Sequence, residues 1–264
     1  MVDLNGRTAL VTGGGQGIGR GIALELAKAG ADLVVVQRDV KLAEAVATEV
    51  RRIGRKAIAL PVDVTDETSV GECISAALAQ FLRVDILVNN AGVAQDKFDA
   101  ETDLATFDSC YAVNLRGSWC VARQLIPHFR KYRNGKIINI ASIEGRRGTI
   151  EQPAYSSSKA ALISITQSLA AILGPDNINV NAVCPGPVWT AQQEHYQRLA
   201  MKRGEIEERR LNENEFYKDY INSIPLRRVA TTADIGLAVA FLASESARNI
   251  TGQALNVDGG IMAN

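Results

Sequence analysis

Residues Thr8–Gly19 read TALVTGGGQGIG, a short apolar run followed directly by a glycine-rich turn. The apolar run is typical of a strand, and after the turn Ile18, Ile22 and Leu26 have the four-residue spacing of a helix face. Glycines let the backbone turn tightly and approach a pyrophosphate, while the start of a helix offers free N–H groups. A strand, a glycine-rich turn and a helix in this order therefore predict a dinucleotide-binding unit.

Short apolar runs and helical patterns alternate along the rest of the chain. The runs lack alternation of apolar and polar residues, which is typical of strands covered on both faces. The first two helical patterns stop at Gly30 and Gly54, because glycine is favoured just past a helix end. This alternation predicts an α/β fold: a single doubly wound, Rossmann-type domain over residues 1–264, with a parallel sheet of about seven strands. The predicted strands are Thr8–Val11, Leu33–Val36, Ala57–Val62, Ile86–Val88, Lys136–Ile140, Asn179–Val183 and Ala254–Val257, and later helices cover about 42–50, 66–81, 103–130, 154–173 and 233–243.

The composition argues against several classes of protein. Lys plus Arg and Asp plus Glu each number 29, so the near-zero net charge argues against a nucleic-acid partner. The cysteines are scattered, with no CxxC pair and no Cys/His cluster, which predicts reduced thiols and no metal site. The chain has no run of ~18 apolar residues and no signal-like start. We therefore expect a cytoplasmic protein that acts on a small molecule and has no membrane partner.

Residues 191–224 interrupt the alternation of strands and helices. This charged, helix-prone segment follows a Pro-Gly-Pro turn. It is long for a connection inside a compact domain, and long connections are often lids or binding segments. We therefore expect a helical lid over the substrate site, with a solvated helical ornament as the alternative.

The end of the second predicted strand indicates which dinucleotide is preferred. An acidic residue there would hold the 2′-hydroxyl of an adenosine ribose, but the position is Gln37, followed by Arg38. Arg can pair with a 2′-phosphate that Asp would repel, which favours NADP(H) over NAD(H). Two alternatives remain, because Gln37 can hydrogen-bond a 2′-hydroxyl and Arg38 can pair with Asp39. Asp63, just after the third strand, is expected to meet the adenine unless it forms a local cap near Thr65.

Several short motifs occur in order on the expected elements. They are Thr12–Gly19 (TGGGQGIG), Asn89–Gly92 (NNAG), Asn114, Ser142, Tyr155–Lys159 (YSSSK), Pro185–Thr190 (PGPVWT) and the closing Thr251–Gly260. The combination resembles the short, single-domain form of the short-chain dehydrogenase/reductase family, and the resemblance covers essentially the whole chain. It implies an oxidoreductase that moves a hydride between a nicotinamide and a secondary alcohol or its ketone. It also implies a homotetramer in which the long helices pair across two-fold axes.

The spacing of Tyr155 and Lys159 supports the same chemistry independently of the resemblance. The two residues are four positions apart, so they share one face of a helix. Lowering the pKa of Tyr from about 10 to roughly 7 requires about 4 kcal/mol, since each pKa unit is worth ~1.4 kcal/mol. One cation about 4 Å from the phenolate supplies about that much at an effective dielectric constant near 20. We therefore expect Tyr155 to transfer the proton, with a plain surface pair as the alternative.

The resemblance implies roles for the remaining motif residues. Ser142 would hold the substrate oxygen, Asn114 would fix a water in a proton relay, and Lys159 would also bind the nicotinamide ribose. The catalytic set is therefore Asn114, Ser142, Tyr155 and Lys159. The expected cofactor-binding residues are Gly13, Gln16, Gly17, Ile18, Gly19, Gln37, Arg38, Asp63, Val64, Asn90, Ala91, Gly92, Tyr155, Lys159, Pro185, Gly186, Val188 and Thr190.

The expected substrate pocket is polar. Glu144 and Gln152 stand where a fatty or steroidal substrate would favour apolar contacts, which favours a small polyol, sugar or diol/hydroxyketone. The lid is similar in length and charge to those of family members that act on such compounds. As an alternative, Glu144 pairs in solvent with an arginine two or three residues later. The expected substrate-binding residues are Ser142, Glu144, Gln152, Tyr155 and Trp189.

Two other classes of function are weaker matches. A nucleotide-sugar epimerase or dehydratase also uses Tyr and Lys four residues apart, but it needs a second substrate domain, for which 264 residues leave little room. A non-catalytic dinucleotide-binding sensor or structural protein would typically have lost Tyr155, Lys159 or Ser142, and this chain has all three.

Overall fold

The computed structural model describes residues 2–94, 102–148, 152–190 and 218–262. Seven strands in this part of the chain form one parallel sheet in the order β3-β2-β1-β4-β5-β6-β7. The predicted parallel sheet of about seven strands is therefore confirmed. The strands are β1 (Thr8–Thr12), β2 (Asp32–Gln37), β3 (Ala57–Pro61), β4 (Ile86–Asn89), β5 (Gly135–Ile140), β6 (Ile178–Pro185) and β7 (Ala254–Val257).

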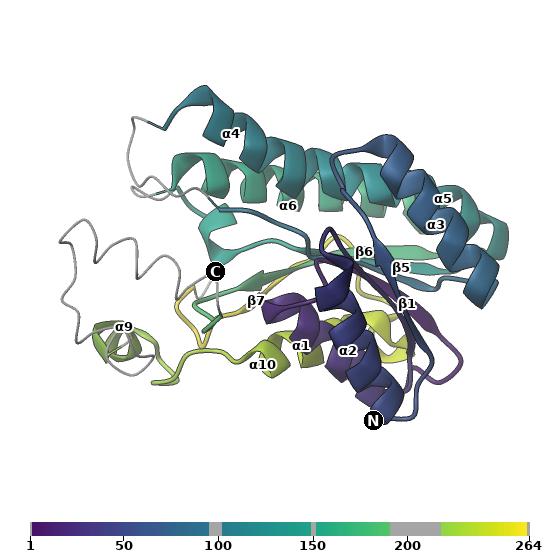
Figure 1. Ribbon diagram of the computed structural model, residues 1–264. Helices are drawn as coiled ribbons and strands as arrows, with labels where there is room; N and C mark the ends of the chain where they lie inside the picture. The colour runs from purple at the N-terminus through teal and green to yellow at the C-terminus, as the bar shows by residue number, and fades with distance from the viewer. Residues whose placement is uncertain (1, 95–101, 149–151, 191–217, 263–264) are drawn as a thin grey trace.

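Helices cover both faces of the sheet (Figure 1). Helices α1, α2 and α10 pack on one face, and α3, α4, α5 and α6 lie on the other. This arrangement is the doubly wound layering that alternating strands and helices predict. The helices are α1 (Gly17–Lys28), α2 (Val40–Arg52), α3 (Glu67–Phe81), α4 (Leu104–Cys110), α5 (Ser118–Tyr132), α6 (Pro153–Leu173), α9 (Lys218–Ser223) and α10 (Thr232–Ala243).

Each face of the sheet has its own hydrophobic core. Successive residues of a strand point to opposite faces, so Val11 packs in the cluster that contains Ile22 of α1. Its neighbour Leu10 packs in the other cluster, with Leu125 of α5. Because both faces are buried, both sets of strand residues are apolar, and this is why the strand sequences show no alternation.

The helix predicted at about 103–130 is not one continuous α-helix. It consists of α4, a π-helical segment over Tyr111–Gly117, and α5. A π-helical turn contains an extra residue, and the apolar pattern of a sequence does not reveal it. At the end of the segment, a Cβ added at Gly117 would lie 2.7 Å from Cγ2 of Val64, so glycine permits this close packing.

The order of the strands creates a crevice at one edge of the sheet. Strand β1 pairs with β2 on one side and with β4 on the other, so β2 and β3 extend the sheet in one direction from β1, and β4 to β7 extend it in the other. In open α/β sheets, ligands bind at the carboxyl ends of the strands beside such a switch point. The glycine-rich turn after β1 and the Asn89–Gly92 motif at the end of β4 both lie at this edge.

Most of the predicted lid at 191–224 lies outside the described residues, which include its end from Lys218 onward. Among the described helices, none combines the length and the apolar character needed to cross a membrane.

Candidate active site

The glycine-rich turn after β1 is closely packed and depends on glycine at several positions. Gly13 and Gly17 have φ angles of +62° and +52°, which side chains rarely adopt. A Cβ added at Gly19 would lie 2.1 Å from the carbonyl oxygen of Gly13. The turn therefore brings backbone close to backbone and leaves the start of α1, at Gly17, open to a ligand phosphate.

Thr12 joins this turn to the end of β4. Its Oγ1 accepts hydrogen bonds from the N–H groups of Asn90 and Ala91, both at 3.0 Å. In return, Nδ2 of Asn90 donates to the carbonyl oxygens of Thr12 (3.0 Å) and Gly13 (3.1 Å). The expected cofactor residues Asn90, Ala91 and Gly13 are therefore held together across β1 and β4. The sequence analysis did not select Thr12, although it lies within the quoted glycine motif.

Gln37 and Arg38 lie where the adenosine ribose was expected. Oε1 of Gln37 accepts the N–H of Gly15 at 3.4 Å, so this side chain faces the glycine-rich turn. Arg38 is exposed, and it makes no ion pair within the described ranges. Asp39 caps α2 by accepting the N–H of Lys41 at 3.0 Å, so the alternative Arg38–Asp39 pair does not form.

Asp63 forms a local turn at the end of β3. Its Oδ1 accepts the hydroxyl (2.7 Å) and the N–H (2.9 Å) of Thr65. These hydrogen bonds, and more weakly the charge of Arg38, lower the pKa of the Asp63 carboxyl below its usual value. The local turn that was the alternative therefore exists, and the contact of Asp63 with adenine remains a prediction.

Asn114 lies fully buried in the π-helical segment and connects two parts of the site. Its Nδ2 donates to the carbonyl oxygen of Val93 and to Oγ of Ser158, both at 2.9 Å. Its Oδ1 accepts the N–H of Val93 at 2.8 Å. The side chain therefore links the chain beyond β4 to α6, where Ser158 precedes Lys159.

Lys159 lies in a buried space between α6 and the ends of β4 and β5. Its Nζ donates to the carbonyl oxygen of Ile140 at 2.7 Å and lies 5.6 Å from the centroid of the Tyr155 ring. A Cβ added at Gly92 would be 3.4 Å from this Nζ and 3.3 Å from Oδ1 of Asn114, so glycine leaves space for both. Burial lowers the pKa of Lys159 to about 8, while Cys184 and Cys110 nearby act in the opposite direction.

Ser142 follows β5 and begins a short 3₁₀ turn over Ile143–Gly145. Its Oγ accepts the N–H of Glu144 at 3.1 Å, so the hydroxyl proton can be donated elsewhere. The turn packs closely on α6: a Cβ added at Gly145 would lie only 2.8 Å from the carbonyl carbon of Lys159. Ser142, Lys159 and Tyr155 are thus held by one packed unit of β5, the turn and α6.

The segment after β6 reaches back to the glycine-rich turn. Gly186 donates its N–H to the carbonyl oxygen of Val257 at 3.0 Å, and Val188 forms a bridge with Ala230. The methyl group of Thr190 is 3.6 Å from the position of a Cβ at Gly17. The two ends of the expected cofactor site, far apart in the sequence, therefore meet.

The expected substrate residues Glu144, Gln152 and Trp189 are all half-buried. Oε2 of Glu144 is shielded from solvent. Arg146 donates to Oδ1 of Asn256 at 3.2 Å and to the carbonyl oxygen of Ala254, on the strand β7.

In the part of the chain that the structure describes, no cluster of three or more His, Cys, Asp and Glu side chains is arranged to hold a metal ion.

Comparison with known proteins identifies the family. Residues 13–262 match the family model described as enoyl-(acyl carrier protein) reductase. A short-chain dehydrogenase/reductase of Armillaria gallica is 37% identical over 261 residues, covering 97% of this chain and 96% of the relative. The chain belongs to the short-chain dehydrogenase/reductase family. It is therefore an NAD(P)-dependent oxidoreductase that acts on a CH–OH group or the corresponding ketone.

Two further members of this family differ in substrate. The 3-oxoacyl-[acyl-carrier-protein] reductase of Aquifex aeolicus (strain VF5) is 35% identical over 261 residues, covering 98% of this chain and 99% of the relative. A 7α-hydroxysteroid dehydrogenase, solved with NADH and 7-oxo glycochenodeoxycholic acid, is 32% identical with a TM-score of 0.87. That match covers 98% of this chain and 95% of the other. Relatives of similar identity thus act on different compounds.

The structure also reveals supporting residues that the sequence analysis did not assign to the site. These residues form a buried chain of hydrogen bonds. Nδ2 of Asn89 donates to the carbonyl oxygen of Ser118 (3.2 Å) and to Oδ1 of Asn139 (2.9 Å). Nδ2 of Asn139 in turn donates to Oγ1 of Thr166 (2.8 Å). It crosses β4 and β5 and connects the start of α5 to α6. The asparagine within the apolar run Lys136–Ile140 was the available signal, because a polar residue in a buried strand requires partners.

Proposed function

We propose that this short-chain dehydrogenase/reductase uses NADP(H) and acts on a small polar hydroxy or keto compound, with Tyr155 as the acid/base. The observation that carries this proposal is the buried Lys159 ammonium, 5.6 Å from the centroid of the Tyr155 ring. A fixed cation near the phenol favours its ionised form. With its pKa lowered to about 8, Lys159 is still mostly protonated at neutral pH and can supply that charge.

Ser142 holds the reacting oxygen in this mechanism. Because its Oγ accepts the Glu144 N–H, its own proton is available to the substrate oxygen. Such a donor stabilises the negative charge that develops on that oxygen. Tyr155 then delivers the proton during reduction, or removes it during oxidation. A nicotinamide cofactor, when bound, would supply or accept the hydride. Asn114 positions the relay by joining Ser158 to Val93.

The residues present fit a nicotinamide dinucleotide. Any side chain at Gly19 would collide with Gly13, so glycine permits the tight turn into α1, and the first N–H groups of a helix can bind a pyrophosphate. We assign Thr190, whose methyl group is 3.6 Å from the position of a Cβ at Gly17, to the nicotinamide end of the cofactor. The proposed cofactor-binding set is the one predicted from the sequence, including Gln16, Ile18, Val64, Pro185 and Val188.

The preference for NADP(H) rests on Arg38. Its guanidinium is exposed beyond β2 and makes no ion pair with any described residue. The neighbouring carboxylate, Asp39, is engaged in capping α2. A 2′-phosphate at this position would meet the Arg38 guanidinium in place of the acidic residue that would repel it at the end of β2.

The proposed substrate is a polyol, sugar or diol/hydroxyketone. The support is the chemistry beside Ser142, where Glu144 places a shielded carboxylate oxygen and Gln152 adds an amide. Polar side chains at these positions suit a substrate that carries hydroxyl groups better than one that presents a hydrocarbon chain. The second candidate is a 3-oxoacyl thioester, favoured by the 35% identity to the Aquifex aeolicus reductase.

We also propose a homotetramer formed through the α4–α5–α6 face. Large apolar side chains remain exposed there: Phe107 by 39%, Trp119 by 38% and Ile172 by 59%. Exposed apolar residues on neighbouring helices are typical of an interface between subunits. A monomeric mass in solution at micromolar concentration would contradict this assembly.

The experiment is a screen of polyols, sugars, diols and 3-oxoacyl thioesters with NADPH, NADP⁺, NADH and NAD⁺, following nicotinamide absorbance. Tyr155→Phe keeps the ring and removes the proton carrier, so we expect at least 10²-fold lower kcat/KM with unchanged NADPH affinity. Arg52→Ala, an exposed change on α2, serves as the control and should retain full activity. Retention of more than a tenth of wild-type kcat/KM in Tyr155→Phe would refute the proposed proton carrier.

A further inference from the structure

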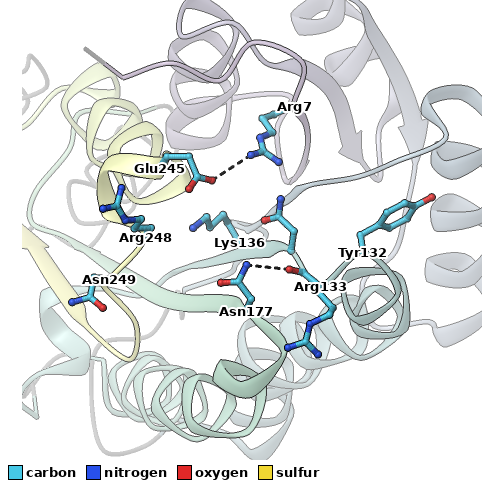
Figure 2. A pocket seen from close by; sticks show the side chains of 9 residues that line it. Arg7, Tyr132, Arg133, Lys136, Asn177, Glu245, Arg248 and Asn249 are labelled. Carbon is cyan, nitrogen blue, oxygen red and sulfur yellow. Dashed lines mark hydrogen bonds and ion pairs between the residues drawn. The ribbon is translucent and has the colours of Figure 1, made fainter.

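A hollow, shown in Figure 2, is lined by residues near the starts of several strands of the sheet. Its volume is about 930 Å³. Arg7 immediately precedes β1, Lys136 is the second residue of β5, and Asn177 immediately precedes β6. Because the strands are parallel, these positions gather where the strands begin, whereas the cofactor-binding motifs follow their carboxyl ends. The hollow is therefore separate from the dinucleotide site.

The hollow carries an excess of positive charge. Its lining contains four basic side chains and a single carboxylate: Arg7, Arg133, Lys136, Arg248 and Glu245. The chain as a whole has no net charge, so this concentration is local. A concave surface lined by one sign of charge attracts ions of the opposite sign.

The carboxylates at this edge are already engaged by arginines. Arg7 pairs with Glu245 and with Asp85, each at 3.2 Å, and Arg83 also pairs with Asp85, at 2.6 Å. Within the described ranges, Arg133, Lys136 and Arg248 make no ion pair. Three cations around the hollow thus have no direct carboxylate partner among the residues that the structure describes.

Lys136 is the central member of this group. It is only 7% exposed, and its Nζ donates to Oδ1 of Asn179 at 2.7 Å, a neutral acceptor. Figure 2 shows it between Arg7 and Asn177, with Arg248 on one side. A buried ammonium is costly without a counter-charge, and burial lowers the pKa of Lys136 accordingly, with Glu245 opposing that effect.

We propose that this hollow binds a small phosphate-class anion between Lys136, Arg248 and Arg7. A phosphate dianion can use the planar fork of Arg248 together with the point charge of the lysine, and the remaining N–H groups of Arg7, whose terminal nitrogens also pair with Asp85 and Glu245. It would supply the charge that the buried Lys136 lacks. The site would be occupied independently of the cofactor, because it lies at the opposite edge of the sheet.

The experiment measures phosphate binding to the full-length protein saturated with NADPH, so that phosphate cannot enter the dinucleotide site. Inorganic phosphate and, separately, glycerol 3-phosphate are titrated calorimetrically at constant ionic strength, with sodium chloride as the control for screening. Binding of inorganic phosphate supports a free anion as the ligand. Tighter binding of the ester, lost in the same variants, supports a phosphorylated metabolite.

Three variants test the location of the site. Lys136→Met and Arg248→Ala should each weaken phosphate binding by about tenfold or more, the usual effect of losing one charge-assisted bond. Glu245→Gln should tighten binding severalfold, because it removes the lining carboxylate and one of the two ion pairs of Arg7; misfolding cannot cause such a gain. The matched control Arg52→Ala should bind phosphate like wild type.

The proposal fails if titration of wild-type protein with phosphate up to about 20 mM gives no heat beyond that of sodium chloride. We expect the dissociation constant of a specific site of this kind to be no higher than roughly that concentration. It also fails if Arg248→Ala and Glu245→Gln both leave the affinity unchanged. Should Lys136→Met not fold, these two exposed positions still decide the question.

Discussion

The preference between the two nicotinamide cofactors depends on Arg38, and Arg38→Ala tests it directly. A charge-assisted hydrogen bond contributes about 1.5–3 kcal/mol. Arg38 is exposed, and Asp63 lies near enough for the charge of Arg38 to lower its pKa, so solvent and this carboxylate both weaken the contact. We therefore expect the lower end, about 1.5 kcal/mol, which corresponds to roughly tenfold weaker NADPH binding. NADH affinity should change less than about twofold, since its ribose has no 2′-phosphate.

The assay is equilibrium titration of NADPH and NADH into each protein, following the quenching of tryptophan fluorescence. Trp189 provides the signal because it lies next to Thr190, beside the glycine-rich turn. Lys41→Ala, one turn away at the start of α2, is the matched control for a general loss of positive charge. Gln37→Asp should invert the preference, because the carboxylate repels the 2′-phosphate and accepts the 2′-hydroxyl. Equal loss of NADPH and NADH affinity in Arg38→Ala, or tighter NADH binding by wild type, would refute the reasoning.

The other predictions concern the reacting end and the glycine-rich turn. Ser142→Ala should lower kcat by about 10²-fold with unchanged NADPH affinity, as measured by steady-state kinetics and titration; a change in affinity alone would argue against its role at the substrate oxygen. Gly19→Ala places a Cβ 2.1 Å from Gly13 O, so we expect loss of NADPH binding and a lower Tm, and near-normal binding would contradict the tight turn. Burial lowers the pKa of Lys159 from 10.5 to about 8, so the unfolded chain binds this proton more tightly and the free energy of unfolding rises between pH 8 and 10.5. Relative to Lys159→Met, denaturant unfolding of the wild type should therefore gain up to roughly 3 kcal/mol over that range, and a constant difference would contradict the burial.

Much of the secondary structure follows from the sequence alone, because its causes are local. The β7 residues Ala254–Val257 match the predicted strand at both ends. The helices before Gly30 and Gly54 end as expected, and these glycines have φ angles of +106° and +92°. The glycine-rich turn is likewise a local pattern, because it depends on the backbone conformations that glycine can adopt. The spacing of Tyr155 and Lys159 is local as well, because residues four apart share one face of a helix.

The tertiary structure decided what depends on residues distant in the sequence. The π-helical segment Tyr111–Gly117 interrupts a stretch that has no glycine or proline signal before Gly117, and its side chain Asn114 is held by Val93 and Ser158. Gln37 faces the glycine-rich turn because its Oε1 accepts the N–H of Gly15, 22 residues earlier in the chain, and the local sequence around Gln37 does not indicate this contact.

For Lys159, too, one property follows from the local sequence and another depends on the tertiary structure. Its spacing from Tyr155 could be read from the chain, but its low pKa could not. That pKa depends on the burial of the ammonium, whose Nζ donates to the carbonyl oxygen of Ile140 at the end of β5 and lies 3.4 Å from the position of a Cβ at Gly92, beyond β4. Strands that begin about fifty residues apart meet there only once the sheet has assembled in its particular order.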